Sequence, residues 1–381
     1  MKKVLLVLLA IVMVFSLVAC SQNGGTEAPA AEETAEQEPA TEEPVTNDDS
    51  GDKATEETPS ADASSVVTDK DPSEVVIAGM IHAESYFGSN LLAGMQEACD
   101  EYGVQLVSMN YNLDASKEAE AVNTYIAQGV DGLISNVQES TPDLYKQAAD
   151  AGIVVAAVNT TGPYEFLVSN ITYDQGGLGA GAVDYAVEFI KENLDSKPVT
   201  HMIRVKQGGM TDARGDAFME GIGDTFGEEY GKAVSQSSTF VVADAMQQTL
   251  DALTANPDIN IIFCECEDSM LGAYSAIDSA GYRDKVFVFG VDGNEQLCNY
   301  LLDENDSIFQ GSGAQNAYEM GYQGCKQLIQ TIIGEREPTY NEVDYLEPTR
   351  INKGDLATVK EYYDQLVTLR EQGTGGTSEE S

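Results

Sequence analysis

Apolar and polar positions alternate in blocks along this chain, and from residue 75 onward the blocks predict strands and helices in turn. Residues 75–81 form an apolar run that is short enough for a buried strand. After a polar loop, apolar residues recur four, three and four positions apart between residues 91 and 102, which is the spacing of one helix face. Gly103 then supplies a residue suited to ending the helix. Strand, loop and helix make the first half of a βαβ unit.

The same alternation continues to residue 334 and predicts ten strands. The predicted strands are 75–81, 104–109, 132–136, 153–158, 167–172, 200–205, 236–241, 259–264, 285–290 and 307–311. The helices between them are 89–102, 115–128, 142–150, 176–193, 213–226, 243–254, 268–280, 294–303 and 315–334. Such a series implies parallel sheets covered by helices on both faces. Ten strands are many for one compact domain, so we predict an α/β fold of two doubly wound parallel-sheet lobes.

The two ends of the chain do not follow this pattern. Residues 1–20 have two lysines followed by an apolar run of the length of a signal peptide, and they end in Leu-Val-Ala-Cys20, which resembles the lipobox of bacterial lipoproteins. Residues 21–72 carry fifteen acidic residues against two lysines and almost no large apolar residue. We therefore expect a disordered acidic tether there, and a disordered tail at 371–381.

The predicted lobes share the body of the chain in pieces. We place the first lobe at 73–174 and 315–342, and the second at 175–314 and 343–370. The first crossing between them is then expected near Tyr173, and another near Gln315.

Charge and cysteine content exclude several classes of function. The formal net charge of −44 argues against nucleic acid as a partner, because proteins that bind it present basic surfaces. Five cysteines remain after Cys20, an odd and scattered set that is no disulfide framework.

The chain lacks the sequence patterns of common metal, phosphate and catalytic sites. It has two histidines, His82 and His201, without a C-x-x-C or H-E-x-x-H pattern, so no metal site is expected. It has neither a G-x-x-x-x-G-K-[ST] loop nor a G-x-S-x-G elbow. The glycines of residues 176–181 favour close helix packing over dinucleotide binding. Acidic pairs are too numerous for a glycosidase pair to be picked out or excluded by composition.

Distinctive residues fall just after predicted strands, where parallel sheets bind their ligands. The first such loop holds Ser85, Tyr86 and Phe87, whose rings either meet a ligand or cap the helix and fill the core. The others are Asn159, Thr160, Arg214, Phe240, the run Cys266-Glu267-Asp268, Asp292 and Gln315. Each of two residues also has an alternative to a ligand-binding role. Asp292 caps the following helix, and Arg214 pairs with surface acids such as Asp216.

With these motifs together, residues 74–340 resemble the sugar-binding subunits of bacterial ABC importers, in the periplasmic-binding-protein type I class. The ribose/galactose branch is the most similar. The motifs that carry the resemblance are Gly94, residues 127–134 (AQGVDGLI), 151–155 (AGIVV), 214–218 (RGDAF), 256–259 (NPDI), 271–273 (LGA) and 290–293 (GVDG). The same core fold serves DNA-bound repressors, but here a signal peptide replaces the DNA-binding segment.

The resemblance implies two lobes joined by a three-crossing hinge that close on a ligand. In the ribose-type pattern the ring positions fall on Phe87, with Tyr86 beside it, and on Phe240. The arginine, aspartate and glutamine of that pattern fall on Arg214, Asp292 and Gln315.

Three positions depart from the family pattern. An Asp-Arg pair is replaced by Asn159-Thr160, an asparagine by Cys266, and one of two adjacent aromatic residues by Gly88. Ribose itself is therefore not the expected ligand.

From this resemblance we expect a lipid-anchored, extracytoplasmic solute-binding protein of an ABC importer. It would bind a small polar ligand, in the first place a monosaccharide, and deliver it to a membrane permease as a monomer. No cofactor and no catalytic residue are expected, because the pocket lacks a nucleophile with a base partner. The alternatives are a co-receptor that presents its ligand to a membrane sensor, and a binding protein for a nucleoside or a signalling furanone.

Overall fold

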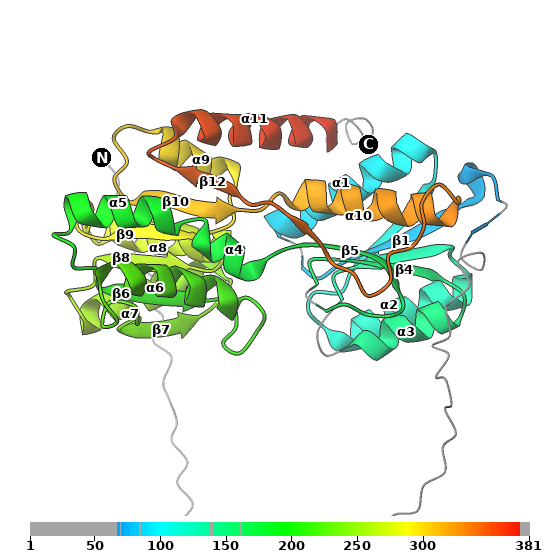
Figure 1. Cartoon of the computed structure of the whole chain (residues 1–381), viewed down its shortest axis with the longest axis horizontal. Helices are drawn as coiled ribbons and strands as arrows, with labels where there is room; N and C mark the ends of the chain where they lie inside the picture. Colours follow the sequence, from blue (N-terminus) through cyan, green and yellow to red (C-terminus); the bar gives the residue numbers. More distant parts are fainter. Residues whose placement is uncertain (1–66, 69, 84, 138–140, 161, 374–381) are drawn as a thin grey trace, which may run out of the picture. The chain divides into compact units, whose positions relative to one another are not determined.

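The computed structural model describes residues 67–68, 70–83, 85–137, 141–160 and 162–373. The predicted signal peptide with Cys20, and most of the predicted tether, lie outside these residues. The described strands form two six-stranded sheets, each the centre of one lobe (Figure 1).

The first sheet is parallel throughout. Its order is β2 (Gln105–Asn110), β1 (Val76–Ile81), β3 (Gly132–Ser135), β4 (Val154–Val158), β5 (Leu167–Tyr173) and β11 (Asp344–Leu346). The second sheet repeats this order with β7 (Ser235–Ser238), β6 (Thr200–Arg204), β8 (Ile261–Cys264), β9 (Phe287–Val291), β10 (Phe309–Ala314) and β12 (Thr349–Asn352). In the second sheet β12 runs antiparallel to β10, and the remaining pairs are parallel.

Helices alternate with strands along the chain in both lobes, which confirms the predicted α/β fold of two doubly wound lobes. A short 3₁₀ turn, η2 (Pro72–Glu74), precedes β1. The first lobe has α1 (Tyr86–Tyr102), α2 (Ala115–Gln128), α3 (Pro142–Asp150) and α10 (Ala317–Ile332). The second lobe has α4 (Gln175–Ala180), α5 (Val183–Asn193), α6 (Asp212–Phe226), α7 (Val242–Ala255), α8 (Glu267–Ser279), α9 (Glu295–Leu302) and α11 (Leu356–Gly373).

Burial of β1 on both faces explains why the sequence reads as a continuous apolar run there. Ile77 and Ile81 belong to the core beneath α1 and α10, while Ala78 and Met80 belong to the core beneath α2 and α3. Successive side chains of a strand point to opposite faces, so a strand covered by helices on both sides needs apolar residues at every position.

The chain passes from one lobe to the other at three places. β5 ends at Tyr173 and α4 follows in the second lobe; β10 ends at Ala314 and α10 follows in the first. The third crossing lies between β11 and β12 at residues 347–348. Our boundary at 342/343 is therefore wrong by a few residues, because β11 adds to the first sheet beside β5.

Both outer boundaries of the folded body also differ from the prediction. The helix α11 extends to Gly373, so residues 371–373 belong to it and not to the tail. At the other end, Lys70 pairs with Asp131 at 2.5 Å and the Thr68 N–H donates to the Ile332 carbonyl. The last residues of the predicted tether are therefore bound to the first lobe.

Helix α1, which follows β1, ends where the sequence predicts but begins at Tyr86, three residues before the predicted start at 89, so Tyr86 and Phe87 lie in its first turn and not in a loop. The Ser85 hydroxyl accepts a hydrogen bond from the Gly88 N–H at 3.0 Å and so caps the first turn. Gly103 ends the helix with φ of +70°, a conformation that glycine adopts without strain. These two residues fix where α1 starts relative to β1, and with it the position of Tyr86 and Phe87.

Helices α1 and α10 approach so closely that two glycines are required where they cross. A Cβ on Gly94 would overlap the carbonyl oxygen of Tyr318, and a Cβ on Gly321 would overlap the carbonyl oxygen of Leu91. Because these obstacles are backbone atoms, they cannot move aside without shifting a helix.

We therefore expect Gly94→Ala to destabilise the protein by about 1–3 kcal/mol, the usual cost of overpacking a core. Denaturant unfolding would measure it. Gly176→Ala is the matched control, because the nearest atoms to its Cβ lie 3.8 Å away. A Gly94→Ala protein within about 0.5 kcal/mol of the parent, the range of ordinary surface substitutions, would contradict this packing.

Candidate functional site

Each sheet reverses its strand order at one point, and these points define where a ligand site is expected. The reversal lies between β1 and β3 in the first lobe and between β6 and β8 in the second. In open α/β sheets, ligands bind beyond the carboxyl ends of the strands at such switch points. The loops after β1, β8 and β9, together with the crossing after β10, carry most of the predicted site residues.

Arg214, Asp292 and Gln315 come together in the second lobe, as one polar cluster. Arg214 lies in the first turn of α6 and is only 4% exposed. Its Nη1 lies 3.6 Å from Asp292 Oδ1, and Gln315 Nε2 donates to the same oxygen at 2.6 Å. Arg214 and Gln315 thus both contact the carboxylate of Asp292.

Two further contacts fix the guanidinium of Arg214. Its Nε donates to Gln175 Oε1 at 2.7 Å, and its Nη1 donates to the carbonyl of Glu265 at 2.6 Å. Gln175 follows the first crossing and Gln315 follows β10 at the second. The polar cluster therefore joins two of the three crossings.

The structure decides between the alternatives left open for Asp292 and Arg214. Helix α9 is capped by Asn294, whose Oδ1 accepts from the Leu297 N–H at 2.9 Å, so Asp292 is not the cap. Asp216 pairs with Arg204 at 2.7 Å, which leaves Arg214 facing Asp292. Helix capping therefore does not explain the position of Asp292, and pairing with Asp216 does not explain that of Arg214.

A second buried carboxyl lies beside Asp292. Glu267, the first residue of α8, is 5% exposed. Burial, and then the nearby Asp292 with which it hydrogen-bonds, raises the pKa of Glu267 well above its usual range. The sequence places the run Cys266-Glu267-Asp268 after a predicted strand, and of these three residues only Cys266 is predicted to bind the ligand. The position of this run directly after the strand end was the signal that pointed to Glu267 as well.

Cys266 itself is a neutral thiol at this edge. Its Sγ lies 3.2 Å from the Ser269 hydroxyl, and burial raises its pKa to about 12. It can offer a weak hydrogen bond to a neighbour but no thiolate nucleophile at neutral pH.

The first lobe brings Tyr86 and Phe87 to the same place from the first turn of α1. Both rings line a small cavity together with Asp292 and Gln315. Phe87 also packs on the core of its own lobe, and its ring centroid lies 5.9 Å from that of His82. Burial raises the pKa of Tyr86 to about 12, so its hydroxyl is a neutral donor and acceptor at neutral pH. The hydroxyl of Ser85 is taken up by the cap of α1.

Asn159 and Thr160 interact mainly within the first lobe. The Thr160 hydroxyl donates to the carbonyls of Val137 and Val158, at 3.3 and 3.2 Å. Asn159 adopts φ of +51°, and its carbonyl accepts from Asn136. The Asn159 Oδ1 atom is buried and has no hydrogen-bond partner among the described residues, so this amide keeps an acceptor free.

Phe240 lies outside the polar cluster. Strand β7 ends at Ser238, three residues earlier than the predicted strand, and Phe240 follows it with 44% of its surface exposed. It does not line the small cavity.

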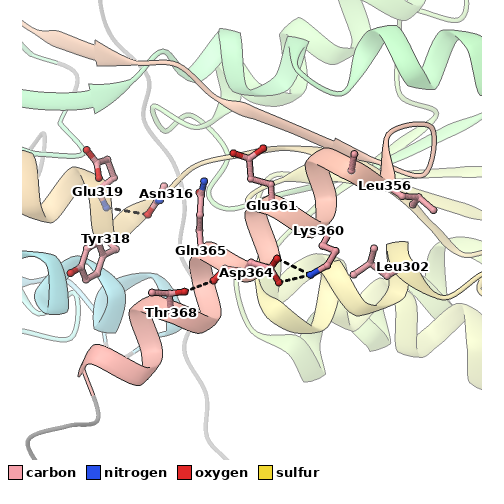
Figure 2. Close-up of a pocket in the computed structure, with 11 residues that line it drawn as sticks. Leu302, Asn316, Tyr318, Glu319, Leu356, Lys360, Glu361, Asp364, Gln365 and Thr368 are labelled. Carbon is pink, nitrogen blue, oxygen red and sulfur yellow. Dashed lines mark hydrogen bonds and ion pairs between the residues drawn. The ribbon is translucent and has the colours of Figure 1, made fainter.

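Two cavities lie near the crossings, and only one has the predicted residues around it. The small cavity beside Tyr86, Phe87, Asp292 and Gln315 has a volume of about 10 Å³, room for roughly one water molecule. A groove of about 1270 Å³ lies along the polar face of α11, between Leu302, Asn316 and Glu319 (Figure 2). None of the predicted site residues lines this groove, so its size alone does not make it the site.

Metal-binding clusters and membrane-spanning helices are both absent from the described residues. No group of three or more His, Cys, Asp or Glu side chains in them could hold a metal ion. Nor does any helix within the described ranges have the length and apolar character needed to cross a membrane.

Comparison with known proteins assigns the fold and the family. The periplasmic binding protein domain matches residues 78–336. The ribose import binding protein RbsB of Escherichia coli is 25% identical over 260 residues, which span 68% of this chain and 84% of that protein.

Two solved structures share the fold. The 5-methylthioribose transporter solute-binding protein of Thermotoga lettingae, in complex with 5-methylthioribose, has a TM-score of 0.68 at 19% identity and covers 81% of this chain and 96% of its own. A carbohydrate transporter solute-binding protein of Agrobacterium radiobacter, in complex with D-arabinose, has a TM-score of 0.68 at 19% identity, with 77% and 99% covered. This chain therefore belongs to the periplasmic binding protein family and has the type I fold of that family.

Proposed function

We propose that this protein is the extracytoplasmic solute-binding component of an ABC importer and that it captures a monosaccharide between its lobes. The observation that carries the proposal is the cluster of Arg214, Asp292 and Gln315 facing the rings of Tyr86 and Phe87. The relatives support it, since the similar proteins named above import ribose or were solved with a pentose or a thiopentose.

The chemistry of this cluster suits a sugar. A furanose or pyranose has apolar C–H faces that pack on aromatic rings, here Tyr86 and Phe87. Its hydroxyl groups need fixed donors and acceptors, and bonds to charged groups are the strongest of these. Arg214 offers donors, and Asp292 and Glu267 offer carboxyl oxygens. The buried Oε1 of Gln315 has no hydrogen-bond partner in the part of the chain that the structure describes, and it offers a further acceptor.

We propose binding without chemical conversion of the ligand. Cys266, a nucleophile candidate at this edge, is held neutral because burial raises its pKa to about 12. Asp292 is paired with Arg214 at 3.6 Å and is hydrogen-bonded to Gln315 and Glu267. A binding role needs no change in the protonation or the position of these groups.

A thermal-shift panel of pentoses, hexoses, polyols, 5-methylthioribose and nucleosides tests the proposal. A ligand that binds only the folded protein raises its stability by about 2.7 kcal/mol at a hundredfold excess over Kd. Stabilisation by one or more sugars is the expected result. Stabilisation by nucleosides alone would assign the site to another ligand class, and no stabilisation by any compound would count against the proposal.

Removing either charge of the cluster should weaken binding. Truncating one partner of a buried, hydrogen-bonded charge pair costs roughly 2–5 kcal/mol. Arg214→Ala or Asp292→Ala should therefore raise Kd by about thirty-fold or more, since 1.4 kcal/mol is tenfold. Calorimetric titration measures this, with thermal unfolding as the check on folding.

Arg350→Ala and Asp184→Ala are the matched controls. These residues form an exposed ion pair at 2.6 Å with each other and not with a residue of the cluster, and they should leave Kd unchanged. Parental affinity in both cluster variants would remove Arg214 and Asp292 from the site.

We further propose that the lobes close on the ligand about the three crossings. The first two crossings are linked to each other, because the Tyr173 hydroxyl accepts from the Asn316 N–H at 3.0 Å. Hinged closure of this kind makes a protein more compact. Small-angle scattering at saturating ligand should give a smaller radius of gyration than the ligand-free protein, whereas an unchanged radius would contradict closure.

Cys20 lies outside the described residues, and its role remains a proposal from the sequence. We propose that the mature protein begins at Cys20 and is held by lipid at the outer face of the cytoplasmic membrane, where the permease is reached. Cys20→Ser should abolish lipidation and leave the protein unprocessed or released. Membrane fractionation and mass spectrometry of the N-terminus would detect this. A Cys20→Ser protein that processes and fractionates like the parent would refute the anchor.

A further inference from the structure

Helix α11 begins after the third crossing and lies beside α9 on the second lobe (Figure 1). Its buried residues Val359, Tyr362 and Leu366 belong to the core cluster that contains Leu297 and Ile351. These three positions recur three and four residues apart, so they form one apolar face of the helix. The opposite face is polar and lines the large groove shown in Figure 2.

Tyr362 attaches this helix to the polar cluster. It is 2% exposed, and its hydroxyl donates to the carbonyl of Gln315 at 3.0 Å. Its ring lies against the backbone of Gly293, where a Cβ would come within 2.9 Å of Tyr362 Cε1. The Tyr362 ring therefore contacts Gly293, which follows Asp292. Its hydroxyl bonds to Gln315, which in turn donates to Asp292.

Leu366 lies one turn further along the same face and reaches the same small cavity. That cavity is bounded by Tyr86 and Phe87 from the first lobe, by Asp292, and by Tyr362 and Leu366 from α11. The cavity therefore has walls from three separate parts of the chain. Two of those walls belong to the site already described, and α11 is the third.

We propose that Tyr362 and Leu366 form an additional side of the ligand pocket and limit the size of the ligand group that points toward α11. This inference rests on the proposed function. Because Tyr362 is fixed by its hydrogen bond and Leu366 is apolar, that end of the pocket takes a small apolar part of a sugar. It excludes a bulky substituent or a second sugar unit. One methylene more or less in an apolar pocket changes selectivity by about 10–200-fold.

A fluorescent reporter tests the geometry without a ligand. The chain has no tryptophan, so a Leu366→Trp variant carries one indole on the inner face of α11. A Leu356→Trp variant, at a position that is 41% exposed and lines the outer groove, is the control on the same helix. Acrylamide should quench the Leu366→Trp protein less than the Leu356→Trp protein.

Adding Tyr86→Ala decides whether the first lobe covers that position. The second substitution should raise the quenching of the Leu366→Trp protein and leave that of the Leu356→Trp protein unchanged. Equal quenching with and without Tyr86 would show that α11 only covers its own lobe, and would overturn the proposal.

Calorimetric titration tests selectivity with ligands taken from the thermal-shift panel. Ribose and 5-methylthioribose are one pair that differs by a small substituent. Leu366→Ala should shift the affinity ratio toward the larger member by about tenfold or more, and Leu356→Ala should not. Leu366→Val, which removes one methylene and leaves a smaller cavity, serves if the alanine variant fails to fold; it should shift the ratio in the same direction by a smaller factor, and an unchanged ratio would refute the role of α11.

The two proposals fail in different ways. If the parent binds nothing in the panel, the proposed function fails, and the fluorescence result alone supports or overturns the contact between α11 and the first lobe. If the parent binds but Leu366→Ala keeps the parental affinity ratio, the binding function stands and the role of α11 is refuted.

Discussion

A buried guanidinium needs partners, and the requirement of Arg214 for them organises the centre of this protein. Leaving such a charge unpaired costs several kcal/mol, so the chain must bring polar groups to it from different elements. They come from Gln175 after the first crossing, from the carbonyl of Glu265 after β8, and from Asp292 after β9. Gln315, at the second crossing, completes the set through Asp292. The groups best suited to a polar ligand are thus also those that hold the crossings together.

A second ion-pair network lies next to this one and shares Glu265 with it. Glu265 is fully buried, and its carboxyl accepts from Arg204 at 3.0 Å and from the Val205 N–H at 2.9 Å. Burial raises the pKa of Glu265 to about 7 despite these partners. Because its carbonyl holds Arg214 while its carboxyl holds Arg204, one residue orients both guanidinium groups. Side chains fixed by such supporting bonds keep a binding site in one geometry before the ligand arrives.

The two lobes repeat one strand order, but they contribute unequally to the proposed site. The first lobe supplies rings from α1, held by the Ser85 cap and by the close crossing of α1 with α10 at Gly94. The second lobe supplies the charges. Helix α11 adds a face that the repeated pattern does not contain, since it follows the last crossing. Its position beside the crossings is what makes it a candidate for selecting the ligand.

The sequence alone determined the alternation of strands and helices, the two parallel sheets and the residues at their carboxyl edges. These features follow from local periodicity, from glycines such as Gly103, and from the burial of strands like β1 on both faces. Motifs of a known family added the trio Arg214, Asp292 and Gln315. Local pattern did not extend to β11 and β12, because both strands are short. Helix α11 was not predicted either, although Val359, Tyr362 and Leu366 recur at helical spacing.

The tertiary structure decided what no local pattern contains. It showed that Asn294 and not Asp292 caps α9, since a cap depends on backbone direction as well as residue type. The Thr160 hydroxyl bonds within its own lobe, and Phe240 lies exposed beyond the end of β7. Glu267 lies beside Asp292. The tertiary structure also brought Tyr362, seventy residues beyond Asp292, onto the backbone of Gly293. Such contacts arise only when separate elements are packed together, because the distance between them in sequence says nothing about their distance in space.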